Sequence, residues 1–338
     1  MNSKQQQAAN SGRLTIRIHR AKPLPASQQT QPERRSNPFA EAASSNNTAL
    51  QASKLKRWVQ EYTIDANEHD SLLDALLTIK RSQDPSLTFR YACAHGMCGS
   101  DGVLINGQPA LLCKSKIGSY AKPALPHARS AGEGSFRRTV QATLISQSQP
   151  TEATGSMPAP YRPAPAPTEA SQSPQPEGNW LGVIEVAPIP GFPILRDLIV
   201  DTDTMFRQIK QVEPYLQPSQ SAQPAQSSDP ADLSGEYLQT PAQLQAYEAL
   251  SNCIACGVCE GACPIYAGGE AFIGPAALVA ASRFVHDSRD AHTLNRLDAI
   301  DSAEGIRACQ AVRACTRYCP RGIDIADTIW SLVQAARR

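Results

Sequence analysis

Apolar and polar residues alternate over residues 14–19, as they do in a strand that buries one face. Residues 71–81 place their aliphatic side chains on one broad face and end in cations, which is typical of a short amphipathic helix. Further strands are indicated at residues 58–64, in a hairpin of residues 103–105 and 110–112 with an Asn-Gly turn, and at residues 180–186. The first part of the chain therefore predicts a small sheet with one helix.

A helical period replaces this alternation in the second half of the chain. A helix is expected at about residues 201–215. From residue 240 onward, apolar residues recur at helical spacing in four segments: residues 243–250, 275–286, 304–314 and 325–338. The second half therefore predicts an all-α domain in which cysteine loops lie at helix ends.

Three stretches follow neither period and are rich in Pro, Gln, Ser and Ala. They are residues 21–56, 130–178 and 217–235. Such segments bury too little apolar surface to form a core, so we expect mostly disordered insertions. A chain of 338 residues with these interruptions is long enough for two compact domains.

The overall charge and hydropathy exclude several classes of partner. The formal net charge of +1 gives no indication of a nucleic-acid partner or of a polybasic membrane anchor. No apolar run approaches the roughly 18 residues that cross a bilayer, and residues 1–13 lack a signal-peptide pattern. The sequence also has no Gly-rich dinucleotide fingerprint and no phosphate loop. We therefore expect a soluble or peripheral, unprocessed chain without substrate chemistry of its own.

The ten cysteines carry the candidate chemistry and fall into three groups. Without a secretory signal, metal or redox chemistry is expected in preference to disulfides. Cys93, Cys98 and Cys113 match the plant-type 2Fe–2S spacing, except that Asp101 stands where the third cysteine belongs. Either Asp101 ligates iron as a hard anion, or it is a turn residue in a broken or zinc-binding site. We favour ligation because the other spacings are intact.

The second group matches the run of a bacterial ferredoxin. Cys253, Cys256, Cys259 and Cys263 follow one another at intervals of three, three and four residues, and Pro264 comes next. In this pattern three cysteines hold one cubane and the fourth ligates the other cluster. Zinc ligands usually come as separated pairs, so the run favours an iron–sulfur cluster over zinc.

The third group fits the same template with one replacement. Cys309, Cys315 and Cys319 take the cysteine positions, and Val312 stands where the middle cysteine belongs. Cys319 would then cross back to the first cubane, and three thiolates would remain for a 3Fe–4S cluster. The expected ligand sets are Cys253, Cys256, Cys259 and Cys319 for a 4Fe–4S cluster, and Cys263, Cys309 and Cys315 for a 3Fe–4S cluster.

These motifs resemble the iron–sulfur subunit of succinate dehydrogenase and fumarate reductase. The resemblance covers the chain apart from the insertions and is carried by residues 87–102, 189–198, 272–276, 287–290 and 319–322. It implies an α+β protein with an N-terminal β-grasp domain of the plant-type ferredoxin class at residues 11–199. An all-α domain that resembles bacterial ferredoxins would follow at residues 200–338. Some members carry Asp at the third 2Fe–2S ligand position, which supports Asp101.

The resemblance also implies a function, partners and a location. The chain would be the electron-transfer subunit of succinate:quinone oxidoreductase, complex II of the tricarboxylic acid cycle. Electrons would pass from FAD in a flavoprotein subunit through the 2Fe–2S, 4Fe–4S and 3Fe–4S clusters to quinone at a membrane-anchor subunit. The complex would lie on the cytoplasmic face of the bacterial inner membrane or the matrix face of the mitochondrial inner membrane. The alternatives are a quinol:fumarate reductase, the partner of another flavin-dependent dehydrogenase, and an interaction protein with structural clusters.

One departure from the family concerns the quinone pocket. The Trp pair and the His that usually help to form it are replaced by Ala267, Gly268 and Gln310. A remodelled site would use Gln310 or Tyr266 as a hydrogen-bond donor, or the anchor subunit would supply the whole site. The candidate quinone-site residues are Pro264, Ile265, Tyr266 and Gln310.

Overall fold

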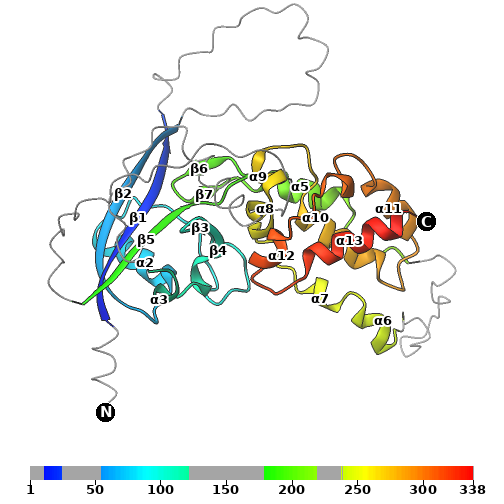
Figure 1. The fold of residues 1–338 in the computed structure, drawn as a ribbon, viewed down its shortest axis with the longest axis horizontal. Helices are drawn as coiled ribbons and strands as arrows, with labels where there is room; N and C mark the ends of the chain where they lie inside the picture. Colours follow the sequence, from blue (N-terminus) through cyan, green and yellow to red (C-terminus); the bar gives the residue numbers. More distant parts are fainter. Residues whose placement is uncertain (1–10, 25–54, 122–178, 219–236, 238, 338) are drawn as a thin grey trace, which may run out of the picture.

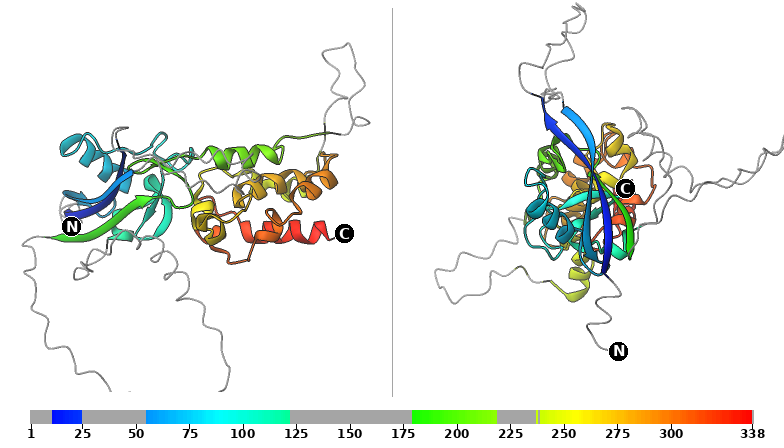
Figure 2. Two further views of the ribbon diagram at one scale, coloured as in Figure 1. Left: turned by 90° about the horizontal axis from the view of Figure 1, so that it is seen from above. Right: turned by 90° about the vertical axis from the view of Figure 1, so that its left-hand side faces the viewer.

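The computed structural model describes residues 11–24, 55–121, 179–218, 237 and 239–337. These residues form a sheet domain and a helical domain that lie end to end (Figures 1 and 2). Most of the three low-complexity stretches lies outside the described residues, so their disorder stays a prediction. No helix within the described ranges has the length and apolar content needed to cross a membrane.

The sheet domain is built on a five-stranded mixed sheet with the order β2-β1-β5-β3-β4. The central strand β1 pairs antiparallel with β2 and parallel with β5, and β5 pairs antiparallel with β3. The strands are β1 Ser11–Pro23, β2 Leu55–Asn67, β3 Gly102–Ile105, β4 Gln108–Leu111 and β5 Trp180–Pro188. All of the predicted strands are confirmed.

The hairpin of β1 and β2 is longer than the sequence predicts. Pro23 still pairs with Leu55, so both strands continue into the stretch predicted to be an insertion. The reason is tertiary: the backbone N–H of Ala21 donates to Asp197 Oδ1, and its carbonyl accepts the N–H of Asp197 at 2.7 Å. The alternation in the sequence ends before these contacts, so it could not indicate them.

Helix α2, Leu72–Ser82, confirms the predicted helix and packs into the core of the sheet domain. Ser71 caps it, and Asp74 completes a capping box by accepting from the backbone of Ser71. The turn between β3 and β4 places Asn106 and Gly107 in left-handed conformations, as a type I′ hairpin requires. Both local signals therefore determined the local structure.

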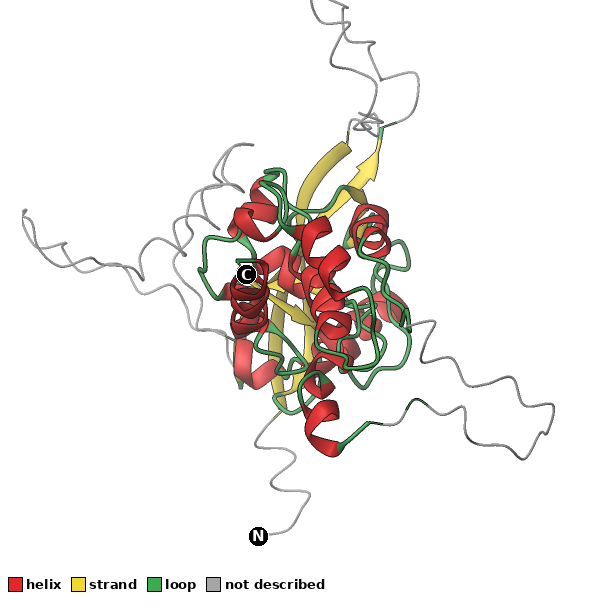
Figure 3. Ribbon diagram, turned by 90° about the vertical axis from the view of Figure 1, so that its right-hand side faces the viewer, coloured by secondary structure: helices red, strands yellow, loops and turns green. Residues whose placement is uncertain are grey.

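In the helical domain the other helices pack around α10 and α13. This domain lies in front of the sheet in Figure 3. Its main helices are α5 Asp203–Gln211, α6 Pro241–Gln245, α7 Glu248–Ser251, α8 Val258–Ala262, α9 Pro264–Gly268, α10 Pro275–Val285, α11 Thr293–Ile300, α12 Ala314–Tyr318 and α13 Ile325–Ala336. The smaller elements of the chain are the helices α3 Ile117–Tyr120, η2 Leu112–Lys114 and η5 Ile306–Ala308, and the hairpin strands β6 Ile194–Arg196 and β7 Ile199–Val200.

Two helix predictions need correction. The predicted helix at 304–314 is wrong: only the 3-10 turn η5 forms before α12 begins at Ala314, and Ala311 and Arg313 adopt left-handed conformations that no α-helix contains. The segment instead bends around a pocket, which its apolar spacing could not reveal. The predicted helix at 243–250 is divided into α6 and α7 by Tyr247, whose φ of −132° interrupts the helical conformation.

The two domains have separate apolar cores. The core of the sheet domain includes Leu14, Ile16 and Leu76, whereas α10 and α13 dominate the other. Ile189 and Phe192, which follow β5, belong to the helical core although they precede the predicted boundary at residue 199. Residues 189–193 therefore join the domains by packing as well as by sequence.

Arg20 is a cation buried inside the sheet domain. Its side chain is 4% exposed, and it donates to both carboxylate oxygens of Asp197 at 3.0 and 3.1 Å. It also contacts Asp84, which accepts a hydrogen bond from Tyr62 Oη at 2.6 Å. Burial opposes the ionisation of Asp84, but hydrogen bonds from Ser86 and Tyr62 and the charge of Arg20 hold its pKa well below the usual range. Arg20 thus ties β1 to the β6–β7 turn.

Arg20→Met should lower the free energy of unfolding of the sheet domain by about 3–5 kcal/mol, because Asp197 and Asp84 would lose their buried cation. Arg17→Met is the matched control on the same strand, since Arg17 pairs with the exposed Glu61 and should change stability by less than about 1 kcal/mol. Amide hydrogen exchange in β1 and β5 measures the opening free energy. Equal losses in the two variants would contradict this role of Arg20.

Candidate metal centres

The first cysteine loop connects α2 to β3 and is shaped by left-handed residues. Ala94, Gly96 and Gly99 all have positive φ, and they turn the loop around Cys93. The Sγ atom of Cys93 accepts the backbone N–H groups of Met97 and Cys98, each at 3.4 Å. Backbone hydrogen bonds from residues 95 and 97 lower the pKa of the Cys93 thiol to about 6. The loop therefore stabilises a thiolate, the form of cysteine that binds metal.

Asp101 lies at the base of this loop and is 3% exposed. Its Oδ2 atom accepts the backbone N–H of Cys113 at 2.7 Å, while Oδ1 is buried and has no hydrogen-bond partner among the described residues. A buried acceptor without a partner costs about 1–3 kcal/mol, and more when it is charged. A turn residue would explain only the Oδ2 contact, whereas an iron atom would also satisfy Oδ1. The surroundings of Asp101 thus fit a metal ligand.

Cys113 lies in the turn η2, next to Asp101 at the base of the first cysteine loop. Burial, a hydrogen bond with Asp101 and the Asp101 charge raise the pKa of the Cys113 thiol to about 12. A thiol with so high a pKa stays protonated beside Asp101, so a bound metal would be needed to ionise it. The structure thus brings Cys93, Cys98, Asp101 and Cys113 to one loop region, as their spacing predicts.

The second and third cysteine groups share one backbone conformation. Ala255 and Ala311, each two residues after the first cysteine of its group, have φ of 48° and 55°. Gly257 and Arg313, each four residues after it, have φ of 73° and 62° and precede the five-residue helices α8 and α12. Val312 therefore occupies the position that Cys256 has in the other loop. The backbone repeats the alignment that the spacing predicts.

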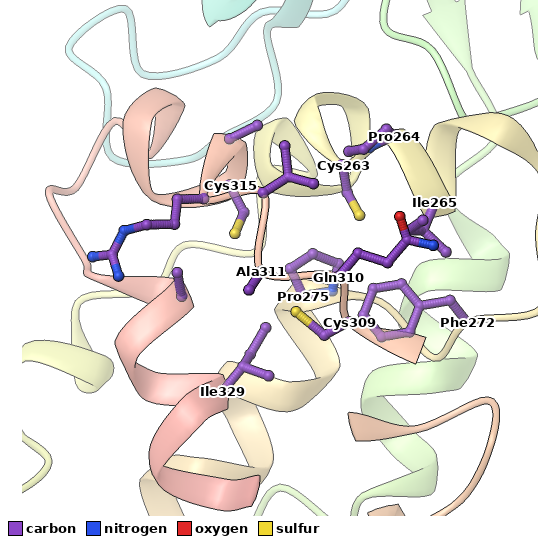
Figure 4. Close-up of a pocket in the computed structure, with 14 residues that line it drawn as sticks. Cys263, Pro264, Ile265, Phe272, Pro275, Cys309, Gln310, Ala311, Cys315 and Ile329 are labelled. Carbon is purple, nitrogen blue, oxygen red and sulfur yellow. The ribbon is translucent and has the colours of Figure 1, made fainter. Parts of the chain in front are cut away.

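Two pockets divide the seven cysteines of these groups between them. A pocket of about 380 Å³, open solvent included, is lined by Cys263, Cys309 and Cys315, whose sulfur atoms point into it (Figure 4). The other pocket, of about 350 Å³ on the same measure, is lined by a separate set of thiols. These are the cysteines expected for the 4Fe–4S cluster: Cys253, Cys256, Cys259 and Cys319. Each pocket collects one predicted ligand set and no thiol of the other.

The chemistry of these pockets suits clusters held by thiolates. Desolvation is the largest cause that raises the pKa of Cys256 and of Cys315 to about 12, so these thiols need a metal to ionise. Val312 lines the larger pocket without a donor atom, which leaves three thiolates there. Within the described residues, no group of three His, Cys, Asp or Glu side chains could hold a single metal ion. A cluster does not require such a group, because its thiolates bind different iron atoms.

Not all of the candidate quinone-site residues line the larger pocket. Pro264, Ile265 and Gln310 line the larger pocket (Figure 4), and Gln310 is exposed. Tyr266 does not line this pocket. Its hydroxyl donates to Gln208 Oε1 at 3.0 Å, and its ring is buried beside Phe192. Gln310 is therefore the better placed of the two predicted donors.

Glu260 is a site residue that the sequence analysis missed. It is fully buried beside the smaller pocket, and burial raises its pKa. Its Oε1 atom accepts the N–H of Ala276 at the start of α10 at 2.7 Å, and its Oε2 atom lies 2.9 Å from Cys259 Sγ. A Glu residue in a short helix is usually expected to be exposed to solvent, so the local sequence did not indicate that Glu260 is buried.

Two family models match the chain. The model described as a 2Fe-2S iron-sulfur cluster binding domain matches residues 15–207, more than half of the 338 residues. The model described as a 4Fe-4S dicluster domain matches residues 249–323, which include the cysteines of both pockets. Together they establish a two-domain ferredoxin-like arrangement.

Similar proteins of known name are iron–sulfur subunits. The chain is 31% identical to the fumarate reductase iron-sulfur subunit of Mycobacterium tuberculosis, over 64% of this chain and 61% of the relative. It is 29% identical to the succinate dehydrogenase iron-sulfur subunit of Coxiella burnetii, over 65% of each chain. Both alignments thus cover less than two thirds of the relative's length.

A solved structure shares the fold. A chain of the Mycobacterium smegmatis Sdh1 complex in the apo form superimposes with a TM-score of 0.60 at 17% identity, covering 96% of this chain and 95% of that chain. At this identity the likeness concerns the fold alone. The 2Fe–2S family model, the named relatives and the three cysteine groups agree with one another. The chain therefore belongs to the family of iron–sulfur subunits of succinate dehydrogenase and fumarate reductase.

Proposed function

We propose that this chain is the electron-transfer subunit of a succinate:quinone oxidoreductase. It would relay electrons from FAD of a flavoprotein subunit, through 2Fe–2S, 4Fe–4S and 3Fe–4S clusters, to quinone at a membrane-anchor subunit. The observation that carries the proposal is the division of seven cysteines between two pockets in sets of three and four. The complex would be peripheral to the membrane, and its place in the tricarboxylic acid cycle follows from succinate as donor.

The finer fold assignment supports this function. We assign the sheet domain to the β-grasp class of plant-type ferredoxins, because α2 packs on a mixed sheet whose first cysteine loop precedes β3. We assign the helical domain to the bacterial ferredoxin class, because α8 and α12 repeat one loop-and-helix unit.

The residues of this chain hold, shield and expose the clusters. Bound clusters supply reversible one-electron transfer. Cys259 and Cys315 are buried, so the protein shields these two thiolates from water. Cys98 is exposed, and Met97 beside it is 50% exposed, which leaves the first loop accessible to an electron donor. Val312 and Gln310 are exposed at the larger pocket, which leaves that pocket accessible to an acceptor.

Fumarate reduction is the second candidate function. The same relay serves both directions, and the relative from Mycobacterium tuberculosis is named as a fumarate reductase subunit. Fumarate-driven oxidation of a reduced quinone, measured on the same preparation, distinguishes the two directions.

The complex captured from membranes on this chain should reduce both ubiquinone and a soluble dye with succinate as donor. Low-temperature electron paramagnetic resonance of oxidised and reduced portions of the same sample should together show three cluster signals, because the ligand sets predict three clusters. Reduction of the dye alone would identify a different final acceptor. Failure to reduce either acceptor would refute the dicarboxylate assignment.

Asp101→Asn should remove most of the 2Fe–2S signal, because the amide lacks the negative charge of a ligand although its oxygen can still accept the Cys113 N–H. Asp101→Cys restores the plant-type ligand set and should retain the cluster at full occupancy with a shifted midpoint potential. Iron content and a redox titration measure both effects. A wild-type signal and potential in Asp101→Asn would mean that Asp101 only accepts a hydrogen bond.

Val312→Cys should convert the 3Fe–4S cluster to a 4Fe–4S cluster, because it adds a thiolate at the position that matches Cys256. The paramagnetic signal of the oxidised 3Fe–4S cluster should then disappear, and the iron content should rise by one atom per chain. Val312→Ala is the matched control and should keep the signal. Persistence of the signal in a folded Val312→Cys chain would show that this position does not face the cluster.

A further inference from the structure

The first cysteine loop lies directly against the second. A Cβ atom built on Gly99 would lie 2.7 Å from the Cβ atom of Cys256 and 3.0 Å from the carbonyl oxygen of Ile254. Real Cβ atoms essentially never make contacts below 3.0 Å. A Cβ atom on Gly102 would lie 3.2 Å from the carbonyl oxygen of Cys256. The backbone of the candidate 2Fe–2S loop therefore touches a ligand of the candidate 4Fe–4S cluster.

Two glycines of the helical domain, Gly257 and Gly261, also contribute to this junction between the two domains. A Cβ atom on Gly261 would lie 2.4 Å from Ile189 Cγ1, and one on Gly257 would lie 3.1 Å from Phe192 Cζ. Ile189 and Phe192 belong to the segment that leaves the sheet, so both domains approach each other through residues without side chains. At the rim, Arg321 Nη1 lies 3.3 Å from Met97 Sδ. The two loops are thus held together from several sides.

We infer that Gly99 is a positioning residue that sets the distance between the first two clusters, and that Cys256 is the ligand through which electrons enter the 4Fe–4S site. This inference rests on the proposed function. In this relay one electron would cross the contact, which would oxidise the first cluster by one electron and reduce the second by one, with no bond formed or broken. Electronic coupling decays exponentially with separation, so a displacement below 1 Å already slows the transfer.

The geometry explains why Gly is needed at this position. The φ of Gly99 is +68°, so an Ala there meets both backbone strain and the wall formed by residues 254–256. Neither atom that it would meet is the end of a flexible side chain, since one is a Cβ atom and the other a carbonyl oxygen. The loops must therefore move apart to accept the methyl group.

Gly96 provides the matched control in the same loop. Its φ is +77°, so Gly96→Ala carries similar backbone strain. Its added Cβ atom would meet only the flexible side chain of Lys114, which can move away. A difference between the two variants therefore reports the contact with Cys256 and excludes the strain of the loop.

The experiment uses the full chain with its clusters, reduced with dithionite. Microwave power saturation of the 2Fe–2S signal reports its magnetic coupling to the reduced 4Fe–4S cluster, which falls steeply with distance. In Gly99→Ala the power at half saturation should fall several-fold while all three clusters remain. Gly96→Ala should saturate as the wild type does. Wild-type saturation in Gly99→Ala, or equal changes in both variants, would overturn the inference.

Gly102→Ala keeps the test decisive if Gly99→Ala fails to assemble its 2Fe–2S cluster. Gly102 does not have a positive φ, and its added Cβ atom requires Cys256 to shift by only a few tenths of an ångström. This variant should change the saturation in the same direction by a smaller factor, and no change would overturn the inference. Absence of the 2Fe–2S and 4Fe–4S signals from the reduced wild-type chain, together with absence of the 3Fe–4S signal from an oxidised sample, would instead refute the proposed function.

Discussion

The convergence of thiol groups on small pockets is the constraint on which the rest of the structure depends. The backbone between these closely spaced cysteines bends through left-handed residues, and the cysteines of each set line one pocket. Ala94, Ala255, Ala311 and Arg313 adopt this conformation without being glycines, at a cost of about 1–3 kcal/mol each. The ligands and the surrounding helices must compensate for this strain. The loops are therefore the parts of the chain that metal binding would stabilise most.

The junction between the domains follows from the same constraint. An electron relay needs its clusters close together, so the loops that hold them must touch. Gly99 and Gly102 make that contact from the sheet domain, while Ile189 fills the space above Gly261. Arg20 and Asp197 hold the β6–β7 turn, which follows the connection out of the sheet, against β1. A buried ion pair in one domain thus helps to orient the route to the other.

The larger pocket shows how a family site is altered while its scaffold remains. Three thiols and Val312 line this pocket, and Gln310, which the family resemblance places where a His is expected, is exposed at it. The hydroxyl of Tyr266 donates a hydrogen bond to Gln208, and Tyr266 does not line the pocket. An acceptor at this pocket would therefore meet the amide of Gln310, aliphatic side chains and the ring of Phe272 on this chain.

The sequence by itself determined the local structure and the grouping of the cysteines. Alternation, the capping box at Ser71 and the Asn106–Gly107 turn act over a few residues, and the cysteine spacing encodes loops that are equally local. The tertiary structure alone decided what depends on residues distant in the chain: the extension of β1 by Asp197, the burial of Glu260 and the contact of Gly99 with Cys256. The apolar spacing of residues 304–314 predicted a helix because it cannot distinguish a helix face from a loop that lines a pocket. Local patterns record what neighbouring residues prefer, whereas burial and contact depend on which distant segments fold against them.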